Sequence, residues 1–134
     1  MERPKMNVEK RDLPDQLDSL TLIEMAANKA DDKKADDIKL FDLNGISLIA
    51  DRVLLCSGQT TVKVRAVAQH VEEELTKAGY TLYGSEGWSD SVWVLLDFGT
   101  VIVHVLRTQE REFYNLERLW SQAPSVSWEP ATNA

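Results

Sequence analysis

The chain of 134 residues has one cysteine, two histidines and no long hydrophobic run, and each scarcity excludes a class of protein. Cys56 cannot form an intramolecular disulfide, and its place in the apolar segment VLLC predicts a buried, inert thiol in a reducing compartment. No apolar stretch approaches the ~20 residues that a membrane helix needs, and the first 25 residues contain no signal-peptide core. We therefore expect a cytoplasmic protein without a membrane segment.

Basic residues are also in deficit. Fifteen Lys and Arg stand against 22 Asp and Glu, which gives a formal net charge of −7. Such a surface repels phosphate, so we expect no direct nucleic-acid site, whereas a basic protein partner would be attracted. The length and the 43% of hydrophobic residues suit one domain with a single core.

Motifs for metal, nucleophile or phosphate chemistry are missing or incomplete. His70 and His104 stand 34 residues apart without HExxH, CxxC or His-x-His, so no metal site is expected. SGQTT could cradle a phosphate before a helix, but it lacks the P-loop lysine and is no nucleophile elbow. Asp97 in LLDFGTV has no second carboxylate beside it, so two-metal nucleotidyl transfer lacks its ligands. We expect a protein that is not an enzyme and needs no cofactor.

Hydrophobic periodicity predicts helices alternating with strands. Thr21 and Glu24 have the form of a capping box, and Thr60 or Thr61 can cap a second helix that Gly79 stops. Helices are expected at 21–34, 61–78 and 109–120. Strands are expected at 36–43, 52–57, 80–84, 93–98 and 100–106. This order predicts an α/β fold with one mixed sheet and helices packed against it.

The strands at 93–98 and 100–106 are expected to form a tight hairpin that places Trp93 opposite His104. One face of this hairpin is aliphatic and should be core: Val94, Leu96, Val101, Val103 and Val105. The other face is mixed: Trp93, Leu95, Asp97, Thr100, Ile102 and His104. The mixed face is either a second core face or a partly exposed anchor site, as an exposed tryptophan beside polar residues would suggest.

In the last expected helix, Phe113, Leu116 and Trp120 share one stripe, a spacing that predicts core packing. Arg111 and Tyr114 lie off this stripe and are therefore available to a partner.

Three segments resemble the Iojap-like ribosomal silencing factor family. They are SLIADRVLLCSGQTTVKVRAVAQHVEEEL, YGSEGWSDSVWVLLDFGTVIVHV and EREFYNLERLW. The resemblance covers about residues 17–122, which we take as the domain, with flexible tails at 1–16 and 123–134. The chain departs from the family pattern within SGQTTVK, at Arg52 and at Thr100.

The resemblance implies a nucleotidyltransferase-like fold without catalytic carboxylates. It also implies binding to ribosomal protein L-fourteen on the large subunit, which blocks subunit joining and lowers translation when nutrients are scarce. The family motif points to the hairpin and the last helix. On this chain the expected partner-binding residues are Trp93, Leu95, Asp97, Phe98, His104, Arg111 and Tyr114.

Their expected roles follow from their chemistry. Trp93, Leu95 and Phe98 would supply apolar anchoring, and Asp97 would pair with a basic residue of the partner. Hydrogen bonds that frame the contact would come from His104, Arg111 and Tyr114. The alternatives are an assembly factor of the large subunit that uses the same docking site, and a residual nucleotide-binding or nucleotidyltransferase-like enzyme that uses SGQTT and Asp97. A face that exposes Trp93 could also pair with itself, so the free protein is a candidate homodimer.

Overall fold

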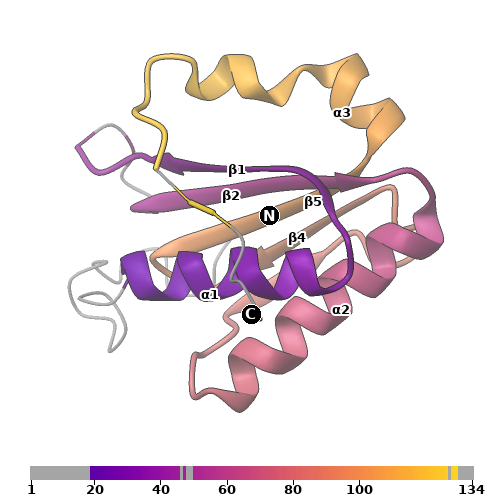
Figure 1. The fold of residues 1–134 in the computed structure, drawn as a ribbon, viewed down its shortest axis with the longest axis horizontal. Coiled ribbons are helices and arrows are strands. Elements are labelled where there is room, and N and C mark those ends of the chain that lie inside the picture. Colours follow the sequence, from indigo (N-terminus) through magenta and orange to yellow (C-terminus); the bar gives the residue numbers. More distant parts are fainter. Residues whose placement is uncertain (1–18, 46, 48–49, 127, 130–134) are drawn as a thin grey trace.

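The computed structural model describes residues 19–45, 47, 50–126 and 128–129 (Figure 1). The expected tail at 1–16 lies outside these residues. The helices are α1 (Ser19–Asp32), α2 (Thr61–Lys77), α3 (Thr108–Tyr114) and the 3-10 helix η3 (Leu116–Trp120). The strands are β1 (Asp36–Asp42), β2 (Arg52–Gly58), β3 (Gly84–Glu86), β4 (Trp93–Asp97) and β5 (Val101–Arg107). In the part of the chain that the structure describes, none of the helices has the length and hydrophobicity of a membrane span.

The strands form one mixed sheet in the order β1-β2-β5-β4-β3. Strands β2 and β5 run parallel, and the other neighbours are antiparallel. Helices α1 and α2 cover one face of the sheet, while α3 and η3 lie on the other (Figure 1). The predicted α/β domain with a mixed sheet and packed helices is therefore confirmed.

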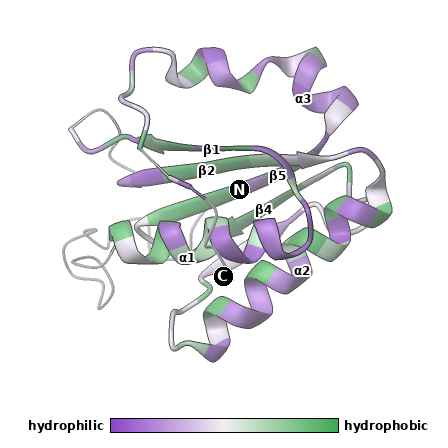
Figure 2. Cartoon of the chain, viewed as in Figure 1, coloured by the Kyte–Doolittle hydropathy of each residue, from purple (hydrophilic) through white to green (hydrophobic). Residues whose placement is uncertain are grey.

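The main core lies between the sheet and the pair α1 and α2. The side chains predicted as the aliphatic face of the hairpin are all fully buried there, together with the apolar stripe of α2: Val64, Val67, Ala68, Val71 and Leu75. Figure 2 shows hydrophobic colour along β2 and β5 and alternating colour around α1 and α2, as expected where only one helix face is covered. Burying one such Val or Leu contributes about 1.5–3 kcal/mol.

The ends of α2 form as predicted. The Oγ1 atom of Thr60 accepts a hydrogen bond from the backbone N–H of Lys63 at 3.1 Å, and Gly79 follows the helix with φ of +105°. The prediction of a capping box at Thr21 and Glu24 is wrong, because both residues lie inside α1, which already includes Ser19.

Two expected elements differ from the prediction. The segment 80–83 is not a strand, and the third strand is β3 at Gly84–Glu86, which overlaps the strand expected at 80–84 only at Gly84. The helix expected at 109–120 is broken at Asn115, which adopts a left-handed conformation with φ 49° and ψ 55°. Asparagine tolerates this conformation better than most residues, so it ends α3 and starts η3 on a new axis.

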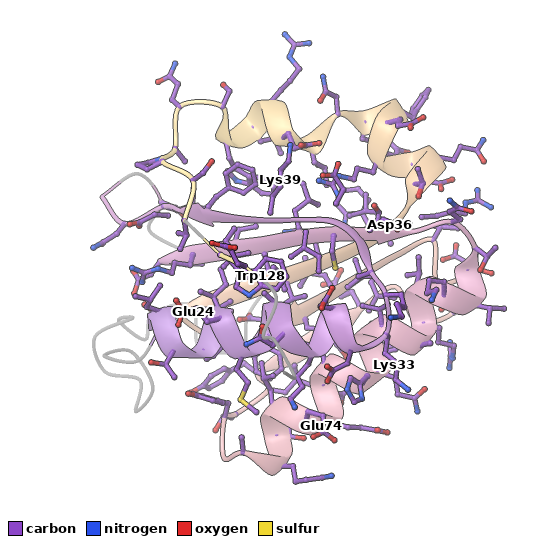
Figure 3. The ribbon with its side chains drawn as sticks, in the orientation of Figure 1. Glu24, Lys33, Asp36, Lys39, Glu74 and Trp128 are labelled. Carbon is purple, nitrogen blue, oxygen red and sulfur yellow. The ribbon has the colours of Figure 1, made fainter. Side chains whose placement is uncertain are left out.

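The chain after η3 is packed against the domain, contrary to the tail predicted for 123–134. The N–H of Asp42 donates to the carbonyl of Pro124 at 2.9 Å, and the N–H of Val126 donates to that of Leu40 at 2.8 Å. The segment thereby crosses the edge of β1 to the α1 side, where Trp128 Nε1 donates to Asn28 at 3.2 Å (Figure 3). Residues 130–134 lie outside the described residues.

Candidate partner-binding surface

A row of aromatic rings crosses the sheet face that carries α3 and η3. Successive ring centroids lie 4.9–6.0 Å apart, a spacing at which tilted and edge-on rings attract one another. In order, the row contains Phe41, Trp120, His104, Trp93, Tyr114 and Phe113. It is buried at Phe41 and exposed at its other end, where Tyr114 is 55% and Phe113 78% exposed.

The hairpin of β4 and β5 has a different register from the prediction but the same two faces. Leu95 pairs with His104, and Trp93 pairs with Leu106, so the placement of Trp93 opposite His104 is wrong. The shift equals two residues, and because side chains alternate with a period of two, every residue keeps its face. The wider turn that causes the shift runs from Phe98 to Val101, where the N–H of Phe98 donates to the Val101 carbonyl at 2.9 Å.

His104 is held in the row as a neutral ring. The indole Nε1 of Trp93 donates to its Nδ1 at 3.1 Å, so Nδ1 must carry a lone pair and Nε2 the proton. Burial lowers the pKa of His104 from 6.5 to about 4, because a charged imidazolium would lose its hydration there. The ring therefore acts as a packing and hydrogen-bonding group near neutral pH.

Half-buried side chains continue the exposed end of the row across the hairpin. Trp93, Leu95 and Ile102 are each partly exposed on this face of the sheet. We call Trp93, Leu95, Ile102, Tyr114 and Phe113 the aromatic surface. It joins rigid rings to aliphatic side chains on a sheet, a composition found at protein-binding hot spots.

Two predicted docking residues are inside the protein. Asp97 is fully buried, and its Oδ1 accepts a hydrogen bond from the N–H of Gly99 at 2.8 Å, which shapes the turn of the hairpin. Phe98 is fully buried in the main core. Neither side chain offers a surface to a partner, so the expected contacts through Asp97 and Phe98 are incompatible with the structure.

Arg111 is also buried, contrary to its predicted availability to a partner. Only 4% of the residue is exposed. Its Nη1 donates to the carbonyl of Asp37 at 2.7 Å and to Ser57 Oγ at 3.2 Å, and its Nε donates to Glu117 at 3.4 Å. Arg111 thus fastens α3 and η3 to β1 and β2, and it positions the aromatic surface without being part of it.

The break at Asn115 exposes a residue that was predicted to be core. Leu116 and Trp120 pack on the sheet in a smaller second core, as predicted, but Phe113 points away from it and is the most exposed ring of the row. The predicted stripe assumed one continuous helix. An asparagine in the middle of that segment was the feature that could have indicated the break.

Comparison with known proteins gives a consistent assignment. A family model described as "Ribosomal silencing factor during starvation" matches residues 16–134. The ribosomal silencing factor of Bacillus subtilis is 41% identical over 104 residues, covering 78% of this chain and 88% of that protein. That of Halalkalibacterium halodurans is 42% identical over 108 residues, covering 81% and 92%. The chloroplast Iojap protein of Zea mays is 24% identical over 112 residues, covering 84% of this chain and 49% of that protein.

Solved structures agree with the fold. A crystal structure from Bacillus halodurans superposes with a TM-score of 0.73 at 38% identity and covers 81% of this chain and 99% of that one. One from Chromobacterium violaceum gives 0.74 at 30% identity and covers 86% and 92%. The motifs of the hairpin and the last helices, the mixed sheet and these matches lead to one conclusion: the chain belongs to the ribosomal silencing factor family.

Proposed function

We propose that this protein binds the large ribosomal subunit through ribosomal protein L-fourteen and blocks joining of the small subunit by steric exclusion. Membership of the ribosomal silencing factor family supports a regulatory role on the ribosome. The finer proposal concerns the partner protein, the surface that meets it and the step that is blocked. Its outcome would be lower translation under nutrient limitation.

The aromatic surface is the observation that carries the proposal. Tyr114 and Phe113 are large rings that remain exposed, and the half-buried Trp93 contacts Tyr114 at 5.7 Å between centroids. These rings contact one another on β4 and α3, so they lose less conformational entropy on binding than isolated side chains would. Removing Trp93 should therefore cost binding about 2 kcal/mol or more.

Net charge supports a protein partner over bare RNA. At −7 the protein is repelled by the phosphates of ribosomal RNA, whereas a basic ribosomal protein would be attracted and oriented by the same field. The residues proposed to contact the partner differ from those predicted from the sequence. Trp93, Leu95 and Tyr114 remain in it, Phe113 joins them, and His104 supports Trp93 from behind.

The nucleotide-binding alternative has less support. At the SGQTT corner, Lys63 packs so close to Gly58 that a Cβ on that glycine would lie 2.5 Å from its Cγ atom. The Nζ of Lys63 is engaged with the carbonyl of Lys33 at 2.9 Å rather than directed at an open phosphate cradle. The relatives are named as silencing factors, which are regulators rather than enzymes.

Sedimentation with ribosomal subunits tests the proposal. The purified protein is mixed with isolated large subunits, and small subunits are added afterwards. We expect co-sedimentation with the large subunit and loss of joined ribosomes. Binding without any effect on joining would favour the assembly-factor alternative. Absence of binding to large subunits, or to isolated L-fourteen, would refute the proposal. Gel filtration of the free protein separately tests whether the aromatic surface also pairs with itself.

A further inference from the structure

A pocket beside α3 forms a second candidate site. It lies on the side of α3 away from the contact between Tyr114 and Trp93. Its volume is about 490 Å³, which suits a small molecule. Residues 108, 111, 112 and 115 of the α3 segment line it, the spacing of one helix face, whereas Tyr114 contacts Trp93 on the other side. The pocket is thus separate from the aromatic surface.

The pocket lies at a reversal in the course of the chain. The parallel strands β2 and β5 end side by side, with Gly58 opposite Arg107. From β2 the chain continues to α2 on one face of the sheet, and from β5 it continues to α3 on the other face (Figure 1). In open α/β sheets, ligands bind in the crevice outside the carboxyl ends of strands at such a reversal. Ser57 and Thr108, from these two strand ends, both line the pocket.

The lining carries four carboxylates and one guanidinium. Glu117 is already paired, because it accepts from Lys39 at 2.8 Å and from Arg111 at 3.4 Å. Asp37 lies 3.6 Å from the Nη2 atom of Arg111. Glu117 is thus paired through hydrogen bonds, Asp37 faces Arg111 at ion-pair distance only, and the remaining excess of negative charge lies on the other two carboxylates.

Asp36 and Glu112 supply this excess from different elements. Asp36 begins β1, at the end of the sheet from which α3 departs (Figure 3), and Glu112 belongs to α3. Within the described part of the chain, neither carboxylate forms an ion pair. Both are therefore available to an ammonium group in the pocket.

Two buried polar atoms in the lining need an acceptor. Among the described residues, Arg111 Nη2 and Thr108 Oγ1 are buried without a hydrogen-bond partner. The Arg111 residue is only 4% exposed, and its 3.6 Å contact with Asp37 Oδ2 is too long for a hydrogen bond. The side chain of Asp37 is 63% exposed, so it can turn aside and admit an oxygen to Arg111. Buried donors of this kind are normally satisfied, which indicates a missing partner.

We propose that this pocket binds a small zwitterion of the α-amino acid class. The ligand carboxylate accepts from Arg111 Nη2 and Thr108 Oγ1, while its ammonium group lies between Asp36 and Glu112. A simple anion is disfavoured by the four carboxylates, and a simple cation would leave Arg111 and Thr108 unsatisfied. A metal ion is disfavoured as well, because the described residues contain no group of three or more ligands placed to hold one.

Titration of the full-length protein with free amino acids tests the proposal. Each common α-amino acid, inorganic phosphate, spermidine and ATP is added separately to ¹⁵N-labelled protein, and amide shifts are followed by NMR. We expect saturable shifts of the amides of Ser57, Thr108 and Arg111 with at least one amino acid. Glu112→Gln, an exposed position that should leave the fold intact, should weaken this binding about tenfold. Glu73→Gln, on the exposed side of α2, is the matched control and should leave the affinity unchanged.

A second variant distinguishes a specific contact with the ligand from a general effect of net charge. Thr108→Val keeps the side-chain shape and the net charge but removes the hydroxyl, so it should also weaken binding of the amino acid. The proposal is overturned by no saturable shift with any amino acid, by equal affinity of wild type and Glu112→Gln, or by binding of spermidine or phosphate alone. Because the pocket is separate from the aromatic surface, none of these outcomes depends on ribosome binding.

Discussion

Acid should destabilise this protein through His104 before it affects the carboxylates. Burial lowers the pKa of His104 to about 4, whereas the unfolded chain has an ordinary value of 6.5. Between these values the unfolded state binds the extra proton, so the free energy of unfolding falls as the pH falls. This contribution is fully present above about pH 6.5 and is lost as the pH falls toward about 4.

The expected loss is large for a domain of this size. The full shift corresponds to about 3 kcal/mol, of which about 2 kcal/mol is lost between about pH 7 and about pH 5. The ion-paired carboxylates Glu110 and Glu117 have pKa values lowered from 4.5 by hydrogen bonds from Arg107 and Lys39, respectively. Their contribution is lost only at lower pH, so a comparison of wild type with a His104 variant between about pH 7 and about pH 5 reports on this histidine.

Urea unfolding at the two ends of this window measures the effect. The matched variant is His104→Gln, which does not titrate and keeps an oxygen that can accept from Trp93 Nε1. We expect the wild type to lose about 2 kcal/mol and the variant to change by less than about 0.5 kcal/mol. NMR titration of the His104 ring gives its pKa directly. A ring that titrates near 6.5, or an equal loss in wild type and variant, would refute the reasoning.

Three further changes test the packing. Gly87→Ala should destabilise the fold by about 3 kcal/mol or more, since Gly87 has a φ of +93° and a Cβ there would lie 1.8 Å from the carbonyl oxygen of Trp93. An unchanged midpoint of urea unfolding would contradict this expected clash. Cys56 is fully buried, and burial raises its pKa to about 12, so an aromatic disulfide reagent should modify this thiol only after unfolding. Rapid labelling of the native protein would disprove the burial of Cys56. Arg111→Met should lower the free energy of unfolding, measured with urea or heat, by about 3 kcal/mol, whereas Arg118→Met, at an exposed position, should lower it by less than about 0.5 kcal/mol. Equal effects of the two substitutions would argue against the role of buried Arg111 in holding α3 and η3 to the sheet.

The elements with a clear period could be predicted from the sequence. The stripe of α2, its cap at Thr60 and the two faces of the hairpin follow from spacings of 3.6 and 2 residues, which depend on local geometry alone. The hairpin register could not be predicted, because a turn of two residues and a longer turn place the same residues on each face. Only the hydrogen bonds within the segment from Phe98 to Val101 distinguish them.

The candidate site was predicted less well, since exposure depends on contacts between distant segments. From the sequence, Arg111 is predicted to be a solvent-facing residue of a helix. It is buried because β1 and β2 supply the carbonyl of Asp37 and the hydroxyl of Ser57 as acceptors. Phe113 reads as core until Asn115 breaks the helix. The exposure of Trp93, Leu95 and Tyr114 could be predicted, because alternation put Trp93 and Leu95 on the mixed face of the hairpin and Tyr114 lies off the apolar stripe of its helix.

The most direct test of ribosome docking through the aromatic surface is sedimentation of large subunits with paired variants. Tyr114→Ala and Phe113→Ala remove exposed rings and should leave the fold intact, and Val62→Ala is the control, since Val62 is 76% exposed at the start of α2. We expect wild type and Val62→Ala to co-sediment and to prevent subunit joining, and the two ring variants and Trp93→Ala to lose both activities. Full binding by folded Tyr114→Ala and Trp93→Ala would contradict the proposed surface.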